Sequence, residues 1–136
     1  MTTVLFACVH NAGRSQMAAG FFNALVDPIK VRGVSAGTQP VNQIHPEVVQ
    51  VMSEVGINLG GATPQLLTEI LAASVQVLVT MGCGEACPFV PVVERIAWEI
   101  SDPKGQSLDR VRAIRDEVLE HVKELIESHA WRRSTP

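Results

Sequence analysis

Three cysteines, Cys8, Cys83 and Cys87, are the side chains of this chain best suited to do chemistry by themselves. A cysteine thiolate is a nucleophile, a metal ligand and a redox group. An odd number of cysteines is not the pattern of a disulfide framework, which is also rare in a reducing compartment. The three thiols therefore indicate a metal site, a catalytic site or simple burial.

Cys8 begins a short loop that ends where a helical pattern starts, at Arg14 and Ser15. Backbone N–H groups at a helix N-terminus are unpaired and carry partial positive charge, so such a loop can hold an anion. Gly13 lets the backbone approach closely, and the guanidinium of Arg14 can grip two oxygens of a tetrahedral oxyanion. We therefore predict an oxyanion site made of these residues: Val9, His10, Asn11, Ala12, Gly13, Arg14 and Ser15.

The same positive field favours the thiolate form of Cys8, which makes it a candidate nucleophile toward the bound oxyanion. Ser15 could donate a hydrogen bond to the sulfur, and Asn11 could brace the loop through its amide. The alternative is a buried cysteine at a strand end beside a solvated arginine. It is disfavoured because Cys8 and Arg14 enclose a glycine-containing loop between a strand and a helix. A nucleotide-binding loop is a poor match, since the chain lacks its Gly-Lys-Ser/Thr sequence here.

The hydrophobic pattern predicts the elements that position this loop. Short apolar or β-branched runs indicate strands at residues 3–7, 30–35, 75–80 and 93–100. Helical periodicity indicates helices over residues 15–26, from Pro46 to Gly56, from Pro64 onward, and a long terminal helix capped by Ser107. The inward side chains would include Val55 in the second helix, and Leu66, Leu67, Ile70 and Leu71 in the third.

Strands that alternate with helices predict an α/β fold with a four-stranded parallel sheet and helices on both faces. We expect one domain over residues 1–130 and a frayed tail over residues 131–136. Ligands of such sheets bind outside the carboxyl ends of the strands. Cys8 follows the first strand, Cys83 and Cys87 follow the third, and Asp102 follows the fourth. The candidate residues therefore fall on one edge of one sheet.

The composition excludes several classes of protein. The chain has 136 residues, of which 46% are hydrophobic and 18% charged, with a formal net charge of −3. A nucleic-acid surface would normally show a basic excess, and a membrane helix needs about 20 apolar residues in a row. Neither feature is present, and the first residues lack the pattern of a signal peptide. We expect a cytoplasmic monomer with no nucleic-acid or membrane partner.

Together these residues resemble the low-molecular-weight protein tyrosine phosphatase superfamily. The resemblance rests on Cys8, five intervening residues, Arg14-Ser15, and Asp102-Pro103 far downstream. The segment Cys8–Ala18, with Ser35-Ala36-Gly37-Thr38 and Thr80-Met81-Gly82-Cys83-Gly84, is similar to the arsenate reductase branch of that superfamily. The resemblance extends to about residue 126 and implies the strand order 2-1-3-4.

The resemblance implies a role for each matched residue. Cys8 would attack arsenate held by Arg14, and Asp102 would protonate the departing oxygen. Cys83 would attack the arsenylated Cys8, release arsenite and leave a Cys8–Cys83 disulfide, which Cys87 would convert into a Cys83–Cys87 disulfide. The electron count is consistent with these roles. Reduction of As(V) to As(III) takes two electrons, and two thiols release two electrons when they form a disulfide.

The implied enzyme has no bound cofactor or metal and takes its electrons from thioredoxin or another thiol donor. Cys83 and Cys87 have three residues between them, a shorter spacing than in the thioredoxin-coupled type. The loop carries Ala12-Gly13 where that type often has Ser-Cys. Thioredoxin is the first expectation, and mycothiol and glutaredoxin systems stay open.

Three other functions could use some of these residues. A structural zinc site at Cys83 and Cys87 would need two more ligands, from Cys8 or from His10, His45, His121 and His129. We expect His121 to face solvent.

A tyrosine phosphatase needs only Cys8, Arg14 and Asp102, and commonly has aromatic residues beside the acid. This chain has no tyrosine, has Lys104-Gly105-Gln106 after Asp102-Pro103, and is expected to bury Trp98 in its core. An arsenite-sensing regulator would need a DNA-reading module.

Overall fold

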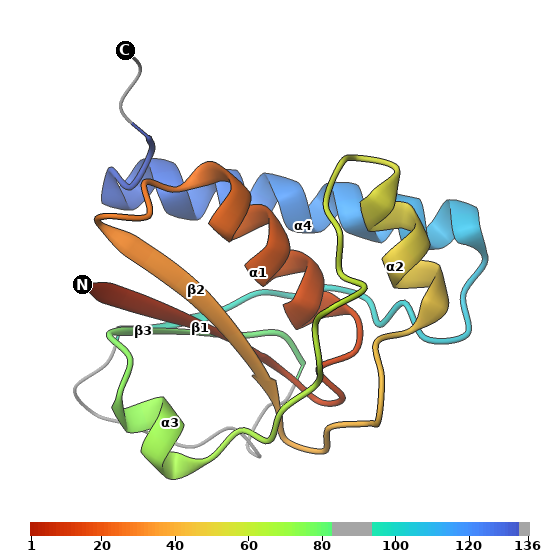
Figure 1. Ribbon diagram of the computed structural model, residues 1–136, viewed down its shortest axis with the longest axis horizontal. Coiled ribbons are helices and arrows are strands. Elements are labelled where there is room, and N and C mark those ends of the chain that lie inside the picture. Colours follow the sequence, from red (N-terminus) through yellow and green to blue (C-terminus); the bar gives the residue numbers. More distant parts are fainter. Residues whose placement is uncertain (83–93, 134–136) are drawn as a thin grey trace.

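The computed structural model describes residues 1–82 and 94–133. Its elements are β1 (Thr2–Cys8), α1 (Arg14–Leu25), β2 (Val31–Gly37), α2 (Pro46–Ser53), α3 (Glu69–Ala73), β3 (Val77–Thr80), β4 (Glu94–Ala97) and α4 (Leu108–His129). In Figure 1, α1, α2 and α4 lie on one side of the strands and α3 lies on the other. None of the described helices combines the length and the apolar character that crossing a bilayer requires.

The four strands form a parallel sheet in the order β2-β1-β3-β4, which confirms the α/β fold and the strand order 2-1-3-4. In the register, Cys8 of β1 pairs with Gly37 of β2, and Ala7 of β1 pairs with Thr80 of β3. The carboxyl ends of the strands are therefore level with one another. This alignment brings the segments that follow β1, β2 and β3 to one edge of the sheet, as the sequence predicts.

The apolar run of β1 is continuous because both faces of the sheet are covered. Val4 and Phe6 belong to the larger core cluster, which includes side chains from α1, α2 and α4. Leu5 and Ala7 belong to a smaller cluster on the opposite face, with Ala72 of α3. Successive side chains of a strand point to opposite faces, so a strand buried on both sides shows no polar alternation.

The expected helix after Pro64 is wrong in its extent, and of its four expected inward residues only Leu67 and Leu71 pack in the core. Helix α3 begins only at Glu69, after Thr68, whose side chain accepts a hydrogen bond from the backbone N–H of Leu71 at 3.0 Å. Leu66 and Ile70 are 55% and 85% exposed. The physical reason is a tertiary contact, because the backbone around Leu66 is extended and bridges Gly37 of β2.

Smaller differences concern element ends. Strand β2 runs on to Gly37, β3 begins at Val77, and β4 ends at Ala97. Helix α2 ends at Ser53, so Val55 lies beyond it and is exposed rather than inward.

Residues 131–133 are held against the fold, so the expectation of a frayed end is wrong for them. The Trp131 ring stacks on His129, with centroids 4.3 Å apart, and meets the ring of Phe22 edge-on at 5.9 Å. Its carbonyl accepts a hydrogen bond from the Asp27 N–H at 3.0 Å. Arg133 donates from Nε to the Val26 carbonyl at 2.8 Å. The segment after α4 thus covers the end of α1.

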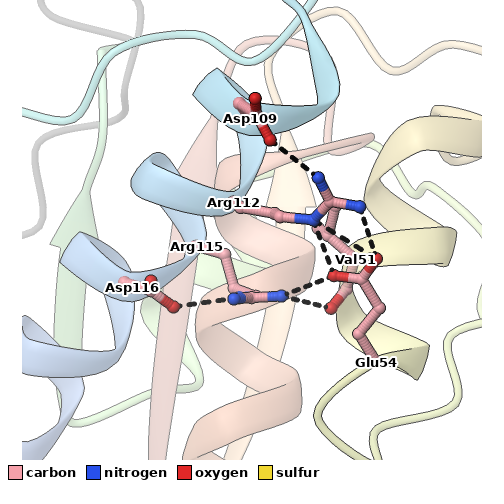
Figure 2. A network of polar contacts seen from close by, with 6 residues as sticks. All are labelled: Val51, Glu54, Asp109, Arg112, Arg115 and Asp116. Atoms are coloured by element: carbon pink, nitrogen blue, oxygen red, sulfur yellow. Dashed lines mark hydrogen bonds and ion pairs between the residues drawn. The ribbon is translucent and has the colours of Figure 1, made fainter.

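An ion-pair network joins α2 to α4 (Figure 2). The Glu54 carboxylate accepts hydrogen bonds from Arg112 Nη2 at 2.8 Å and from Arg115 Nη1 at 3.0 Å. Arg115 Nη1 also donates to the Val51 carbonyl at 2.9 Å. The hydrogen bond from Arg112, with the charges of both arginines, lowers the pKa of Glu54 although burial opposes it. The network fixes the end of α2, whose beginning borders the candidate site.

Candidate active site

Cys8 is the last residue of β1 and is 2% exposed. The loop of residues 9–13 leads from it directly into α1, which begins at Arg14. Asn11, Ala12, Gly13, Arg14 and Ser15 are buried, whereas Val9 and His10 are half-buried. The loop predicted to hold an oxyanion is therefore a compact connection at the carboxyl edge of the sheet.

The carbonyl groups of residues 8–13 all accept hydrogen bonds from α1 or from the segment after β2. Their donors are the N–H groups of Thr38 (3.1 Å), Gln39 (2.8 Å), Val41 (3.2 Å), His45 (3.1 Å) and Met17 (3.0 Å), and Nε2 of Gln16 (3.1 Å). A trans peptide points its N–H away from its carbonyl. The N–H groups of residues 9–14 are therefore turned away from these donors. Successive N–H groups arranged in this way form an anion-binding concavity.

The start of α1 adds to this positive field. Within the described part of the chain, no side chain caps this helix and no acidic residue lies in its first turn. The N–H groups of the first turn are thus free of a competing carboxylate. The loop and the helix start therefore present N–H groups without a competing carboxylate at the place where the sequence leads us to expect an oxyanion.

Asn11 braces the loop through both ends of its buried amide. Its backbone adopts a left-handed conformation, with φ of 52°, which asparagine tolerates better than most residues. Oδ1 accepts hydrogen bonds from Gln16 Nε2 at 3.1 Å and from the Gln65 N–H at 3.0 Å. Nδ2 donates to Ser15 Oγ at 2.7 Å, and Ser15 Oγ lies 2.8 Å from Cys8 Sγ. Since Ser15 Oγ accepts from Asn11, its own hydrogen is available to a Cys8 thiolate.

Arg14 connects this loop to the acid predicted downstream. Its side chain is 10% exposed, and Nη1 donates to the Ile100 carbonyl at 3.2 Å. Nη2 lies 3.8 Å from Asp102 Oδ2. Asp102 is 43% exposed, and its Oδ1 accepts a hydrogen bond from the Lys104 N–H at 3.0 Å. Asp102 therefore shapes its own turn and also presents a carboxylate to the arginine and to solvent.

The turn that carries Asp102 packs directly on the oxyanion loop. A Cβ atom added to Gly13 would lie 2.6 Å from Pro103 Cγ and 3.7 Å from His45 Cδ2. Burial lowers the pKa of His45, although the carboxylates of Asp102 and Glu47 act in the opposite direction. The lowered pKa favours the neutral imidazole of His45 beside this turn.

The structure brings together Cys8, Asn11, Arg14, Ser15 and Asp102, whereas Cys83 and Cys87 lie outside the described residues. Sequence reasoning missed Gln16, Gln65 and Ile100, which hold the amide of Asn11 and the guanidinium of Arg14. Gln65 and Ile100 act through backbone groups, for which a sequence carries no signal.

Gly37 also contributes and did have a signal, because it follows the second strand at the same edge. A Cβ atom added there would lie 2.5 Å from the Val9 carbonyl oxygen and 2.9 Å from the Asn11 nitrogen. Only glycine allows β2 to approach the loop this closely.

The histidines are dispersed. His121 is half-buried and stacks on Trp98 with centroids 5.0 Å apart, so the expectation that it faces solvent is wrong. His129 pairs with Glu94 at 2.9 Å. Over residues 1–82 and 94–133, no group of three His, Cys, Asp or Glu side chains could hold a metal ion.

Known proteins are similar to this chain in sequence and in fold. The family described as low molecular weight phosphotyrosine protein phosphatase matches residues 3–133. A glutaredoxin arsenate reductase of Synechocystis sp. is 36% identical over 129 residues, which cover 93% of this chain and 97% of that protein. An arsenate reductase of Bacillus cereus is 31% identical over 130 residues, 93% of this chain and 95% of that protein.

A solved structure, that of a thioredoxin-dependent arsenate reductase of Corynebacterium glutamicum, has a TM-score of 0.82 and 36% identity. The match covers 94% of this chain and 61% of that one. The chain therefore belongs to the low molecular weight phosphotyrosine protein phosphatase family. Within it, similarity over most of its length places the chain with the arsenate reductases, which confirms the resemblance read from the sequence.

Proposed function

We propose that this protein reduces arsenate to arsenite, with Cys8 as the nucleophile, Arg14 as the oxyanion clamp and Asp102 as the general acid. The observation that carries this assignment is the continuous chain of contacts from Asn11 through Ser15 to Cys8, beside an arginine that faces an acid. A thiolate beneath a tetrahedral oxyanion can displace one oxygen, and a carboxylic acid at the open side can protonate it.

The reduction itself is assigned to a relay of three thiols. Cys8 sulfur replaces one arsenate oxygen, which leaves as water after protonation. Cys83 sulfur then attacks Cys8 sulfur; the S–As bond breaks, its electron pair stays on arsenic as As(III), and a Cys8–Cys83 disulfide forms. Cys87 attacks Cys83, returns Cys8 to the thiolate and leaves a Cys83–Cys87 disulfide. Gly82, the last residue described before this pair of cysteines in the sequence, has its backbone against the Arg14 guanidinium.

An external thiol donor must reduce the final disulfide to complete the cycle. One relative is named a glutaredoxin arsenate reductase and another a thioredoxin-dependent one, so the chain is assigned to a thiol donor rather than to a bound cofactor. We take thioredoxin as the donor, with glutaredoxin and mycothiol as the outcomes to be tested against it. We also assign the protein to the cytoplasm, as a monomer whose catalytic domain extends beyond the expected end at residue 130 to include residues 131–133.

A phosphatase activity is the second candidate, because phosphate and arsenate share shape and charge. Cys8, Arg14 and Asp102 suffice for phosphomonoester hydrolysis. Trp98, the nearest aromatic residue before the acid, is 9% exposed and packs on Phe6 with centroids 5.9 Å apart. Most of its ring is therefore held in the core, which favours a small inorganic substrate and only weak hydrolysis of aryl phosphates.

The test uses three matched variants, Cys8→Ser, Cys83→Ser and Cys87→Ser. Arsenite production and protein thiols are followed with arsenate alone for one turnover, and with each donor system for repeated turnover. Cys8→Ser should lose all activity, Cys83→Ser should release no arsenite by the internal route, and Cys87→Ser should complete one turnover and then stop. Normal cycling of Cys83→Ser with thioredoxin would refute the relay. Hydrolysis of p-nitrophenyl phosphate far faster than arsenate reduction would instead establish the phosphatase.

A further inference from the structure

Gly82 packs its backbone directly on the guanidinium of Arg14. It follows β3 and has a positive φ of 92°. A Cβ atom added at this position would lie 2.4 Å from Arg14 Nη1 and 3.2 Å from Arg14 Cζ. No side chain can occupy this space while the guanidinium stays where it is.

Among the described residues, the polar contacts of the guanidinium come from the segment after β4. Nη1 donates to the Ile100 carbonyl at 3.2 Å, and Nη2 faces the Asp102 carboxylate at 3.8 Å. The Ile100 carbonyl and Asp102 therefore hold the polar edge of the group, and Gly82 limits its position. An arginine grips a tetrahedral oxyanion well only when its planar fork has the correct orientation.

We propose that Gly82 is a positioning residue that sets the orientation of the Arg14 fork and thereby the affinity of the loop for oxyanions. This inference rests on the proposed role of Arg14 as the clamp. If residue 82 gained a side chain, the group that would yield is the guanidinium, since it is the far end of a flexible chain. The fork would then lose its alignment with the bound oxyanion. Removing one charge-assisted hydrogen bond of ordinary strength lowers the affinity for the oxyanion about tenfold or more.

The experiment separates this steric effect from backbone strain. Gly82→Ala places a Cβ against Arg14 and strains the left-handed backbone. Gly82→Asn places the same Cβ with less strain, because asparagine tolerates positive φ. Gly56→Ala is the matched control, since Gly56 has φ of 83° and an added Cβ there would meet nothing within 4 Å. Circular dichroism and urea unfolding report whether each variant folds.

Phosphate affinity is the readout, measured without turnover. Bound inorganic phosphate should shield Cys8 from alkylation by iodoacetamide, and the extent of alkylation of the Cys8 peptide against phosphate concentration, measured by mass spectrometry, gives the dissociation constant. Gly82→Ala and Gly82→Asn should both bind phosphate at least about tenfold more weakly, whereas Gly56→Ala should match the wild type. Wild-type phosphate affinity in either Gly82 variant would overturn the proposal. Failure of both variants to fold would also overturn it, because the added Cβ would then have displaced the backbone and not the Arg14 guanidinium.

A double-mutant cycle tests the route of the effect. In an Arg14→Lys background the fork is absent but the charge remains, so adding Gly82→Ala should cause no further loss of phosphate affinity. An equal loss in both backgrounds would overturn the proposal. The proposed function fails separately: a wild-type protein that binds phosphate through Arg14 but does not reduce arsenate would refute the reductase and leave the role of Gly82 standing.

Discussion

Replacing Asn11 with alanine should destabilise this protein far more than the loss of an ordinary loop asparagine. Asn11 is fully buried, and its amide makes three hydrogen bonds: to Ser15 Oγ at 2.7 Å, from the Gln65 N–H at 3.0 Å and from Gln16 Nε2 at 3.1 Å. The substitution removes all three and leaves the loop in a left-handed backbone that alanine disfavours.

The expected loss follows from these contacts. The Gln16 amide keeps a second acceptor, the Asn11 carbonyl at 3.1 Å, so its contribution is small. The bonds to Ser15 and Gln65 should cost about 1 kcal/mol each, and more where the partner stays buried and unpaired. The left-handed backbone adds about 1 kcal/mol. A decrease of about 3–4 kcal/mol in the free energy of unfolding is therefore expected, a large share of the roughly 5–15 kcal/mol of a typical domain.

Urea unfolding at neutral pH measures this loss, with two control variants. Asn23→Ala removes an amide that also makes two backbone hydrogen bonds, both with Gly33, at 2.8 and 2.9 Å. Asn23 is exposed, so water replaces these bonds and the loss should be about 1 kcal/mol or less. Asn11→Gly removes the same amide without the left-handed strain and should recover about 1 kcal/mol relative to Asn11→Ala. A loss for Asn11→Ala no larger than for Asn23→Ala would refute the bracing role.

Three further outcomes follow from individual contacts. Ser15→Ala removes the hydrogen bond to Cys8 Sγ and should slow alkylation of Cys8 about tenfold at fixed neutral pH; an unchanged rate would show that the serine does not stabilise the thiolate. Asp102→Asn should lower the rate of arsenate reduction about 100-fold without weakening phosphate binding, so a loss confined to KM would contradict its role as acid. Glu54 has a pKa held below its ordinary value of 4.5, chiefly by the hydrogen bond from Arg112. It therefore stabilises the fold above about pH 4.5 and loses this effect as the pH falls through its folded pKa, so urea midpoints of Glu54→Gln should depend less on pH in that range.

The strand, loop and helix around Cys8 could be predicted from the sequence because their determinants are local. A run of apolar residues ends at Cys8, a glycine follows, and a helical pattern begins at Arg14. The strand and the helix fix the direction of the chain on both sides, and the helix start supplies the positive field. To predict the position of Asp102, only one rule was needed: parallel strands have their carboxyl ends at the same edge of the sheet. Its distance of 3.8 Å from Arg14 agrees with that rule.

The prediction failed where tertiary hydrogen bonds compete with local periodicity. The apolar spacing of Leu66, Leu67 and Ile70 suits a helix, but the Leu67 N–H donates to the Gly37 carbonyl at 2.8 Å, and Gly37 donates to the Gln65 carbonyl at 2.9 Å. These bonds draw the segment into an extended conformation along β2 and set the Gln65 N–H against the Asn11 amide. No pattern within residues 63–71 could reveal partners that lie about 30 residues earlier.

Three glycines show what kind of signal a sequence does carry for such a site. An added Cβ would meet Pro103 at Gly13, the Val9 carbonyl at Gly37 and the Arg14 guanidinium at Gly82. Gly37 and Gly82 each lie at the carboxyl end of a parallel strand, where several chain segments converge on the oxyanion loop. Backbone segments can come this close only where no side chain lies between them. A glycine at the carboxyl end of a strand therefore predicts that another chain segment approaches the backbone there. The identity of the approaching group depends on the register of the sheet, and only the fold supplies it.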